Sequence, residues 1–201
     1  MSVFFYLLAI GIWLALLTVT KRAELHAWHF LIGSAGLFIL LMVVVRPVAT
    51  QPLAQVVSAL VGAVGKLTGQ FSAYFKYGII FLSTHGESLT LQIDFECSGI
   101  IEIAAFESLL CFFNVYSSLE KLLLAIIGFC YIMLANAFRI LVICFAVCIF
   151  GPGAYYVVHA IVGRILFYIL SIYLYFYIFT KPQVVRMKVG SFVYAHPKEN
   201  P

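Results

Sequence analysis

"LLLAIIGFCYIMLANAFRILVICFAVC", residues 122–148, decides the fold class, because Arg139 is its only charged side chain. A helix of about 20 apolar residues is long enough to cross the hydrocarbon core of a bilayer. Similar apolar runs occupy residues 3–20, 27–45, 99–116 and 155–180. The sequence therefore predicts an all-α integral membrane protein with about five to six transmembrane helices.

The composition of the chain agrees with this class. Of its 201 residues, 64% are hydrophobic and 10% are charged, with a mean hydropathy of +1.09. A soluble domain is about half apolar and about a quarter charged. The apolar runs use most of the length, so we expect one membrane-embedded domain over residues 1–201. The net charge of +4 forms no basic patch with interleaved aromatic residues, so we expect the lipid bilayer and not nucleic acid as a partner.

Residues 50–96 differ from the rest of the chain. "QPLAQVVSALVGAVGKLTGQF" (51–71) has apolar residues at helical spacing that Gln, Ser, Gly and Lys interrupt, which predicts an amphipathic helix lying on the outer face of the membrane. "YGIIFLSTHGESLTLQIDF" (77–95) predicts two short strands around a turn at residues 85–87. We therefore expect a small β-hairpin outside the lipid, just before Cys97.

The distribution of basic residues predicts the orientation of the helices. Cytoplasmic loops carry an excess of Lys and Arg, and so does the C-terminal tail here, with Lys181, Arg186, Lys188 and Lys198. Counting the runs back from a cytoplasmic C-terminus places Cys97 on the outer side. If residues 50–70 span the membrane, the N-terminal topology inverts, but the side that carries Cys97 does not. Residues 1–10 lack the basic n-region of a signal peptide, so we expect the first run to be retained as a helix.

Three polar side chains fall at one depth on separate helices. Arg139 lies roughly 27 Å along its helix from Lys121, near the outer boundary of a core about 30 Å thick. His159 lies one turn into the last run, and Cys97 stands at the outer mouth of its own run. Taken singly, each has an ordinary structural explanation: a packed thiol, an arginine that snorkels, or a hydrogen-bonded histidine. Together they predict a functional site, because ionisable groups within membrane helices are expensive and mark such sites.

A thiol, an imidazole and a guanidinium at one place suit acyl transfer. A free cysteine, with a pKa of about 8.5, is mostly protonated at neutral pH and needs activation. The helix start and Arg139 favour the thiolate, and the charge of Glu96 opposes it. His159 can carry the proton between the thiol and a leaving amine. Arg139 can stabilise an oxyanion with donors that stay charged.

Three motifs in order, "ECSGI" (96–100), "NAFRI" (136–140) and "HAIVGRILF" (159–167), resemble the exosortase/archaeosortase family. The resemblance covers roughly residues 46–180. It implies a membrane cysteine transpeptidase that cuts exported proteins on the outer face of the cytoplasmic membrane. Their C-terminal sorting signals consist of a short motif, a transmembrane helix and a basic tail. A cysteine thioester then transfers the product to an acceptor. This chain is shorter than the larger members, which leaves substrate and acceptor open.

The resemblance also implies roles for individual residues. Cys97 corresponds to the nucleophile, Arg139 to the group that stabilises the transition state, and His159 to the general acid and base. The supporting positions that match the three motifs are Ser98, Gly99, Asn136 and Gly163.

Two further charged residues lie just inward of this site. Glu102 follows Cys97 by five residues and Arg164 follows His159 by five, so both should lie roughly 7 Å deeper. We hypothesise that they form an ion pair between their helices. Glu107 has no predicted partner.

Two other classes of function remain open. The chain could be a non-catalytic membrane protein, such as a small transporter or an assembly partner, in which case Cys97 would tolerate substitution. Transporters are built with paired broken helices, and only the glycine-containing segment 50–70 hints at one. The other class is a metal or haem site, since His26 with His29 and Cys144 with Cys148 have ligand-like spacing. These pairs should lie on opposite membrane faces without a third ligand, so we expect neither metal nor cofactor.

Overall fold

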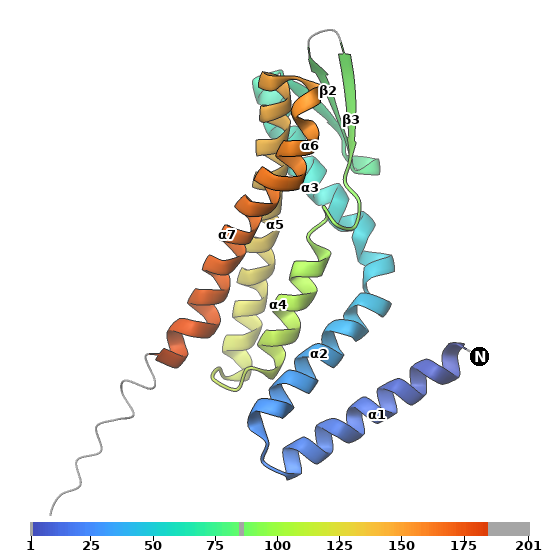
Figure 1. Ribbon diagram of the computed structural model, residues 1–201, viewed down its shortest axis with the longest axis vertical. Coiled ribbons are helices and arrows are strands. Elements are labelled where there is room, and N and C mark those ends of the chain that lie inside the picture. The colour runs from blue at the N-terminus through green and yellow to red at the C-terminus, as the bar shows by residue number, and fades with distance from the viewer. Residues whose placement is uncertain (1, 85–86, 185–201) are drawn as a thin grey trace, which may run out of the picture.

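The computed structural model describes residues 2–84 and 87–184 of the chain, and its helices extend along one long axis (Figure 1). A small sheet lies at one end of this axis and helix α1 at the other (Figure 1). The predicted turn residues His85 and Gly86, and the basic tail residues Arg186, Lys188 and Lys198, lie outside the described residues.

The described helices confirm an all-α membrane protein. Five segments are long and apolar enough to cross a membrane: Phe4–Arg22, His26–Val44, Arg46–Thr68, Ser118–Phe150 and Pro152–Val184. They correspond to α1 (Ser2–Arg22), α2 (His26–Val44), α3 (Arg46–Thr68), α5 (Ser118–Phe150) and, after a 3-10 turn (Pro152–Ala154), a last segment. This segment consists of α6 (Tyr155–Val157), a π-helical turn (Val158–Val162), α7 (Gly163–Tyr175) and a second π-helical turn (Phe176–Thr180).

One of the predicted elements differs from the structure, and the membrane position of another stays a prediction. The segment expected to be an interfacial helix is α3, which qualifies by length and composition as a membrane span. The run 99–116 forms α4 (Ile100–Phe112), whose 13 residues span about 20 Å and so fall short of a complete crossing. The helix is short because Gly99 precedes it in a left-handed conformation and Phe113 ends it in an extended one. The other residues of the apolar run 99–116 lie in the segments that connect α4 to its neighbours.

The predicted hairpin is a three-stranded antiparallel sheet. Strand β2 (Ile79–Thr84) lies between β1 (Phe71–Tyr74) and β3 (Glu87–Gln92). The additional strand β1 follows α3 directly, because Gly69 ends that helix in a left-handed conformation. The sheet packs against α3 and α5.

The core lies where α3, the sheet, α4 and α5 meet. Helix α3 buries Val57 and Val61 at a spacing of one turn, and they pack in one cluster with Ile80 of β2 and Ile143 of α5. Phe71 of β1 meets Phe145 of α5 edge-to-face, with ring centroids 5.6 Å apart. The sheet end of the molecule is therefore held together by apolar contacts among all of its elements.

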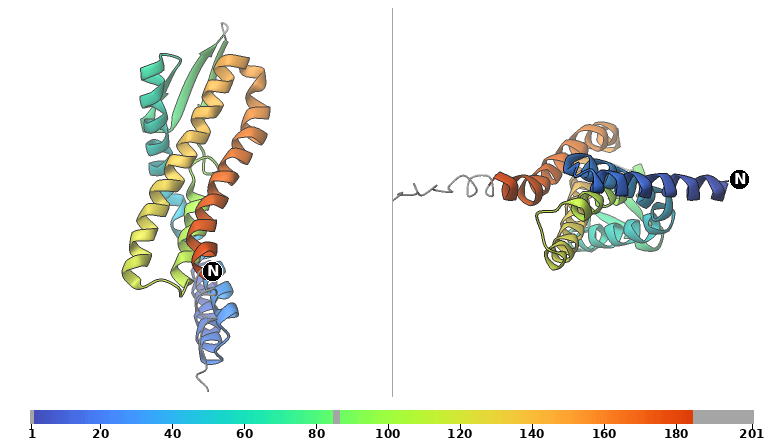
Figure 2. Two further views of the ribbon diagram at one scale, coloured as in Figure 1. Left: turned by 90° about the vertical axis from the view of Figure 1, so that its left-hand side faces the viewer. Right: turned by 90° about the horizontal axis from the view of Figure 1, so that it is seen from below.

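Helix α5 is the longest element and fixes the scale of the molecule. Its 33 residues span about 50 Å, which exceeds a hydrocarbon core of about 30 Å. A capping box between Ser117 and Glu120 begins it, and Gly151 ends it. The α4–α5 connection lies at the end away from the sheet, and α5 runs from there towards the sheet (Figures 1 and 2). Helix α5 is therefore longer than a single crossing of the lipid core requires.

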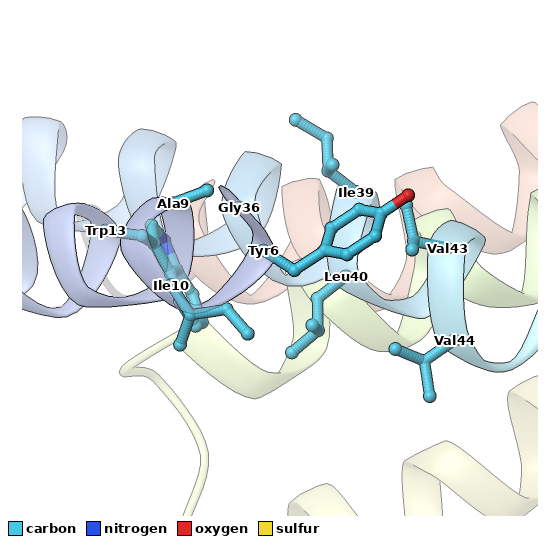
Figure 3. A pocket seen from close by; sticks show the side chains of 9 residues that line it. All are labelled: Tyr6, Ala9, Ile10, Trp13, Gly36, Ile39, Leu40, Val43 and Val44. Atoms are coloured by element: carbon cyan, nitrogen blue, oxygen red, sulfur yellow. The ribbon is translucent and has the colours of Figure 1, made fainter. Parts of the chain in front are cut away.

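Helices α1 and α2 form a hairpin whose first helix extends away from the other helices (Figure 2). The indole Nε1 of Trp13 donates a hydrogen bond of 2.9 Å to the carbonyl of Ile32. Side chains of both helices surround an apolar cavity of about 430 Å³ (Figure 3). The polar side-chain groups that Figure 3 draws there are the Tyr6 hydroxyl and the Trp13 indole N–H. This cavity lacks the residues needed for acyl transfer.

Candidate active site

A tight turn before α4 presents Cys97. The Asp94 carboxylate accepts hydrogen bonds from the backbone N–H groups of Glu96 (3.1 Å) and Cys97 (3.2 Å). The Ser98 hydroxyl donates to the carbonyl of Phe95 at 2.9 Å. Gly99 closes the turn with φ +81°, a conformation that other L-residues rarely adopt. Ser98 and Gly99 therefore shape the turn that carries the thiol.

Asn136 fastens this turn to α5. Its Nδ2 donates a hydrogen bond of 2.6 Å to the backbone carbonyl of Cys97, and the side chain is completely buried. A buried side-chain hydrogen bond of this kind resists exchange with water, so it fixes the turn to one point on α5. The position of the thiol thus depends on two elements that are 39 residues apart in sequence.

Arg139 lies one turn beyond Asn136 on α5. Its side chain is only 7% exposed, and its guanidinium carbon lies 5.4 Å from the centre of the Phe167 ring on α7. Arg139 Nε is buried and has no hydrogen-bond partner among the described residues. A buried, charged donor without a partner is costly, which indicates a function for this side chain.

The absence of a side chain at Gly163 allows α7 to lie close to Arg139. A Cβ atom at this position would lie 3.0 Å from Cδ1 of Ile143 and 3.4 Å from Cγ of Arg139. The first of these distances is shorter than ordinary van der Waals contact. Gly163 therefore accommodates α5, the neighbouring helix of this chain.

His159 faces Cys97 from the last segment. It lies in the π-helical turn Val158–Val162, a local widening that is frequent at functional sites. Its Nε2 is 4.0 Å from the Cys97 Sγ. The imidazole stacks on the ring of Tyr155, with centroids 5.2 Å apart and planes inclined by 23°. The imidazole and thiol are thus close enough to exchange a proton after a small approach.

These side chains line one cavity of about 310 Å³ between α4, α5 and the last segment. Its lining residues are Phe95, Glu96, Cys97, Ile101, Glu102, Arg139, His159, Arg164, Phe167 and Tyr168. The three groups that the sequence puts at one depth are therefore brought together.

The expected ion pair between Glu102 and Arg164 is not formed. Both residues line the cavity, but Glu102 Oε2 is buried without a hydrogen-bond partner. Their equal offsets from Cys97 and His159 predicted equal depth, but depth does not determine the direction in which each side chain leaves its helix. Helix α4 packs on α2 and α5, whereas α7 packs on α5.

Burial dominates the electrostatics of the thiol. Removal from water raises the pKa of Cys97 to about 11, against a lowering by the Arg139 charge and with a further rise from the Asp94 charge. The thiol is therefore protonated at neutral pH, and a base must take its proton when it reacts. The N–H of Cys97 already donates to Asp94. Arg139 lines the same cavity, carries a fixed charge and has an N–H at Nε that is unpartnered among the described residues, so it can donate to an oxyanion.

Three residues of this region were missed from the sequence. Asp94 precedes Cys97 by three residues, a spacing that suits a turn closed by a carboxylate. Tyr155 precedes His159 by four residues, which places the two on one helix face. Arg46 gave no signal in the sequence. Its guanidinium carbon lies 3.9 Å from the centre of the Phe95 ring, although the two residues are far apart in the sequence.

Metal ligation finds no support in the described residues, where no group of three or more His, Cys, Asp or Glu side chains is arranged to hold an ion. Cys144 is buried in the core instead, and the thiol of Cys148 lies 3.9 Å from the backbone oxygen of Gln70.

Comparison with known proteins adds a family. The family model described as transmembrane exosortase matches residues 1–177. No curated protein and no solved structure matches the chain. The family match extends to the first residue and so includes α1 and α2, which lie outside the region of motif resemblance. Because it covers most of the 201 residues, the chain belongs to the transmembrane exosortase family.

Proposed function

We propose that the protein is a membrane cysteine transpeptidase that cleaves the C-terminal sorting signals of exported proteins. Its substrates would carry a short motif, a transmembrane helix and a basic tail, as the family resemblance implies. The observation that carries the proposal is the distance of 4.0 Å between Cys97 Sγ and His159 Nε2, in a cavity that also contains Arg139.

The first half of the reaction forms a thioester. His159 Nε2 takes the thiol proton while Cys97 Sγ bonds to the carbonyl carbon of the scissile peptide. The guanidinium of Arg139 stabilises the negative charge on the carbonyl oxygen. The imidazolium then gives its proton to the leaving amine as the C–N bond breaks. This order agrees with the raised pKa of the Cys97 thiol, about 11, because burial favours the protonated form before the reaction.

The second half releases the product. An acceptor amine or hydroxyl, or water, gives its proton to His159 and attacks the thioester carbon. The C–S bond breaks, and the departing thiolate recovers the proton from the imidazolium. Asn136, Ser98, Gly99 and Gly163 support both halves by keeping the turn and the two helices in place.

The proposed orientation puts the site on the outer side of the cytoplasmic membrane. The α1–α2 connection, the α4–α5 connection and the C-terminal end of α7 lie away from the sheet (Figure 1). Basic residues accompany each of them, namely Lys21, Arg22, Lys121 and Lys181. An excess of Lys and Arg marks the cytoplasmic side, which supports an outward-facing sheet.

The test replaces Cys97 by Ala in the producing cells and follows exported proteins by gel mobility. Cys111→Ala is the matched control, because Cys111 is an exposed cysteine in the last turn of α4. We expect uncut precursors to accumulate only in the Cys97 variant. Normal processing by an expressed and inserted Cys97→Ala protein would contradict the proposal and favour a non-catalytic assembly partner.

A further inference from the structure

The His159 ring has a contact to the Cys97 thiol at Nε2, but within the described part of the chain no hydrogen bond at its other nitrogen fixes its orientation. Its Nδ1 is buried without a partner among the described residues. Histidines that act as bases are commonly held through the second ring nitrogen, which bonds to a carboxylate or a carbonyl oxygen. Another contact must therefore keep Nε2 directed at the thiol of Cys97.

Tyr155 makes that contact. Its ring lies nearly parallel to the imidazole, at a centroid distance of 5.2 Å. Tyr155 is only partly exposed and packs against the core cluster, so its own ring is held in place. Gly151, with φ +84°, and the 3-10 turn Pro152–Ala154 bring the chain around so that Tyr155 opens the last segment.

We propose that Tyr155 is a positioning residue for His159, which deepens the proposed function and rests on it. Stacking restricts rotation of the imidazole out of its plane and so keeps Nε2 towards Cys97. The face of an aromatic ring also attracts a cation, so Tyr155 favours the imidazolium that forms when His159 takes the thiol proton. The aromatic ring performs both roles, and the hydroxyl group is not needed for either.

A purely structural role makes a different prediction. If Tyr155 only fills the core, any residue of similar size serves, and its loss should add to the loss of His159. If it acts through His159, its substitution should have no effect once His159 is gone. A double-mutant cycle separates the two cases.

The experiment uses the full chain in detergent micelles and follows alkylation of Cys97 by iodoacetamide at neutral pH, which needs no identified substrate. We expect His159→Ala to slow alkylation, Tyr155→Leu to slow it about 10-fold, and Tyr155→Phe to remain within about twofold of the parent, since general bases contribute about 10²-fold or more. The double variant Tyr155→Leu with His159→Ala should be no slower than His159→Ala alone. Tyr156→Leu is the control, because that neighbouring ring is 77% exposed.

The rates of these variants test the positioning role of Tyr155 and the role of His159 as base separately. A normal rate in Tyr155→Leu, or losses that multiply in the double variant, would overturn the positioning role. If His159→Ala leaves alkylation unchanged, the proposed base itself fails, and with it the inference. If Tyr155→Leu does not give a monodisperse protein, Tyr155→Met replaces it, since a flexible Met side chain fills core gaps without stacking as an aromatic ring does.

Discussion

At the scale of residues, two charges act on the Cys97 thiol in opposite directions. The Asp94 carboxylate raises its pKa and the Arg139 guanidinium lowers it, after burial has raised it most. The helical rise was enough to predict from sequence that Cys97, Arg139 and His159 share one depth. It could not predict the bonds of Asp94 or the stacking of Tyr155, because these depend on local turns and side-chain directions.

Substitution of Asp94 should make the thiol more acidic. Asp94→Asn keeps an oxygen that can accept from the amides of Glu96 and Cys97, but it removes the negative charge. The thiol pKa should therefore fall below about 11, and more thiolate should be present at any given pH. The measurement is the pH dependence of Cys97 alkylation in the full chain. Its midpoint should move to lower pH.

A substitution of Arg139 supplies the control, because it should shift the pKa of the Cys97 thiol in the opposite direction. Arg139→Gln removes the positive charge that lowers the thiol pKa, so the same midpoint should move to higher pH. Shifts in the same direction for Asp94→Asn and Arg139→Gln would contradict this account of the electrostatics.

At the scale of elements, the site depends on how α7 crosses α5. The sequence predicted both helices, but it assigned a full crossing to the run 99–116, which follows Cys97. Apolar length decided that assignment, whereas the backbone at Gly99 and Phe113 limits α4 to 13 residues. The sequence predicted an interfacial position for α3, because Gln, Ser, Gly and Lys interrupt apolar residues at helical spacing. In the structure one of these polar residues, Gln55, donates to the backbone carbonyl of Lys76 beside the sheet.

A side chain at Gly163 should separate the two helices. Gly163→Ala places a methyl group 3.0 Å from Cδ1 of Ile143 and 3.3 Å from the carbonyl oxygen of Val158, so these neighbours must give way beside Arg139. Overpacking of this kind costs about 1–3 kcal/mol. We expect a lower thermal midpoint in detergent and slower precursor processing, both greater in Gly163→Leu. Gly11→Ala is the control, since no atom lies within 4 Å of a Cβ at that position. Equal behaviour of Gly163→Ala and Gly11→Ala would show that the close crossing is not needed.

At the scale of the whole molecule, the sheet end determines on which side of the membrane the site acts. Composition alone predicted a membrane protein, and the distribution of basic residues predicted its orientation. The sequence did not show that the sheet, α3 and the end of α5 form one packed unit, because that unit depends on contacts between distant segments.

The orientation can be measured with single cysteines in an otherwise cysteine-free chain. Ser83 is exposed on β2, and Asn114 is exposed in the connection between α4 and α5. A membrane-impermeant maleimide applied to intact spheroplasts should label Ser83→Cys directly, and Asn114→Cys only after permeabilisation. The reverse pattern would put the sheet and the Cys97 cavity in the cytoplasm and exclude action on exported proteins.

The central claim is that Cys97 forms a thioester with the substrate. The most direct measurement isolates the full chain from cells that express a tagged precursor and maps its peptides by mass spectrometry after acid quenching. We expect a substrate-derived adduct on the peptide that contains Cys97, removed by hydroxylamine and absent from Cys97→Ala. Continued processing with no adduct on Cys97, or with the adduct on another cysteine, would contradict it.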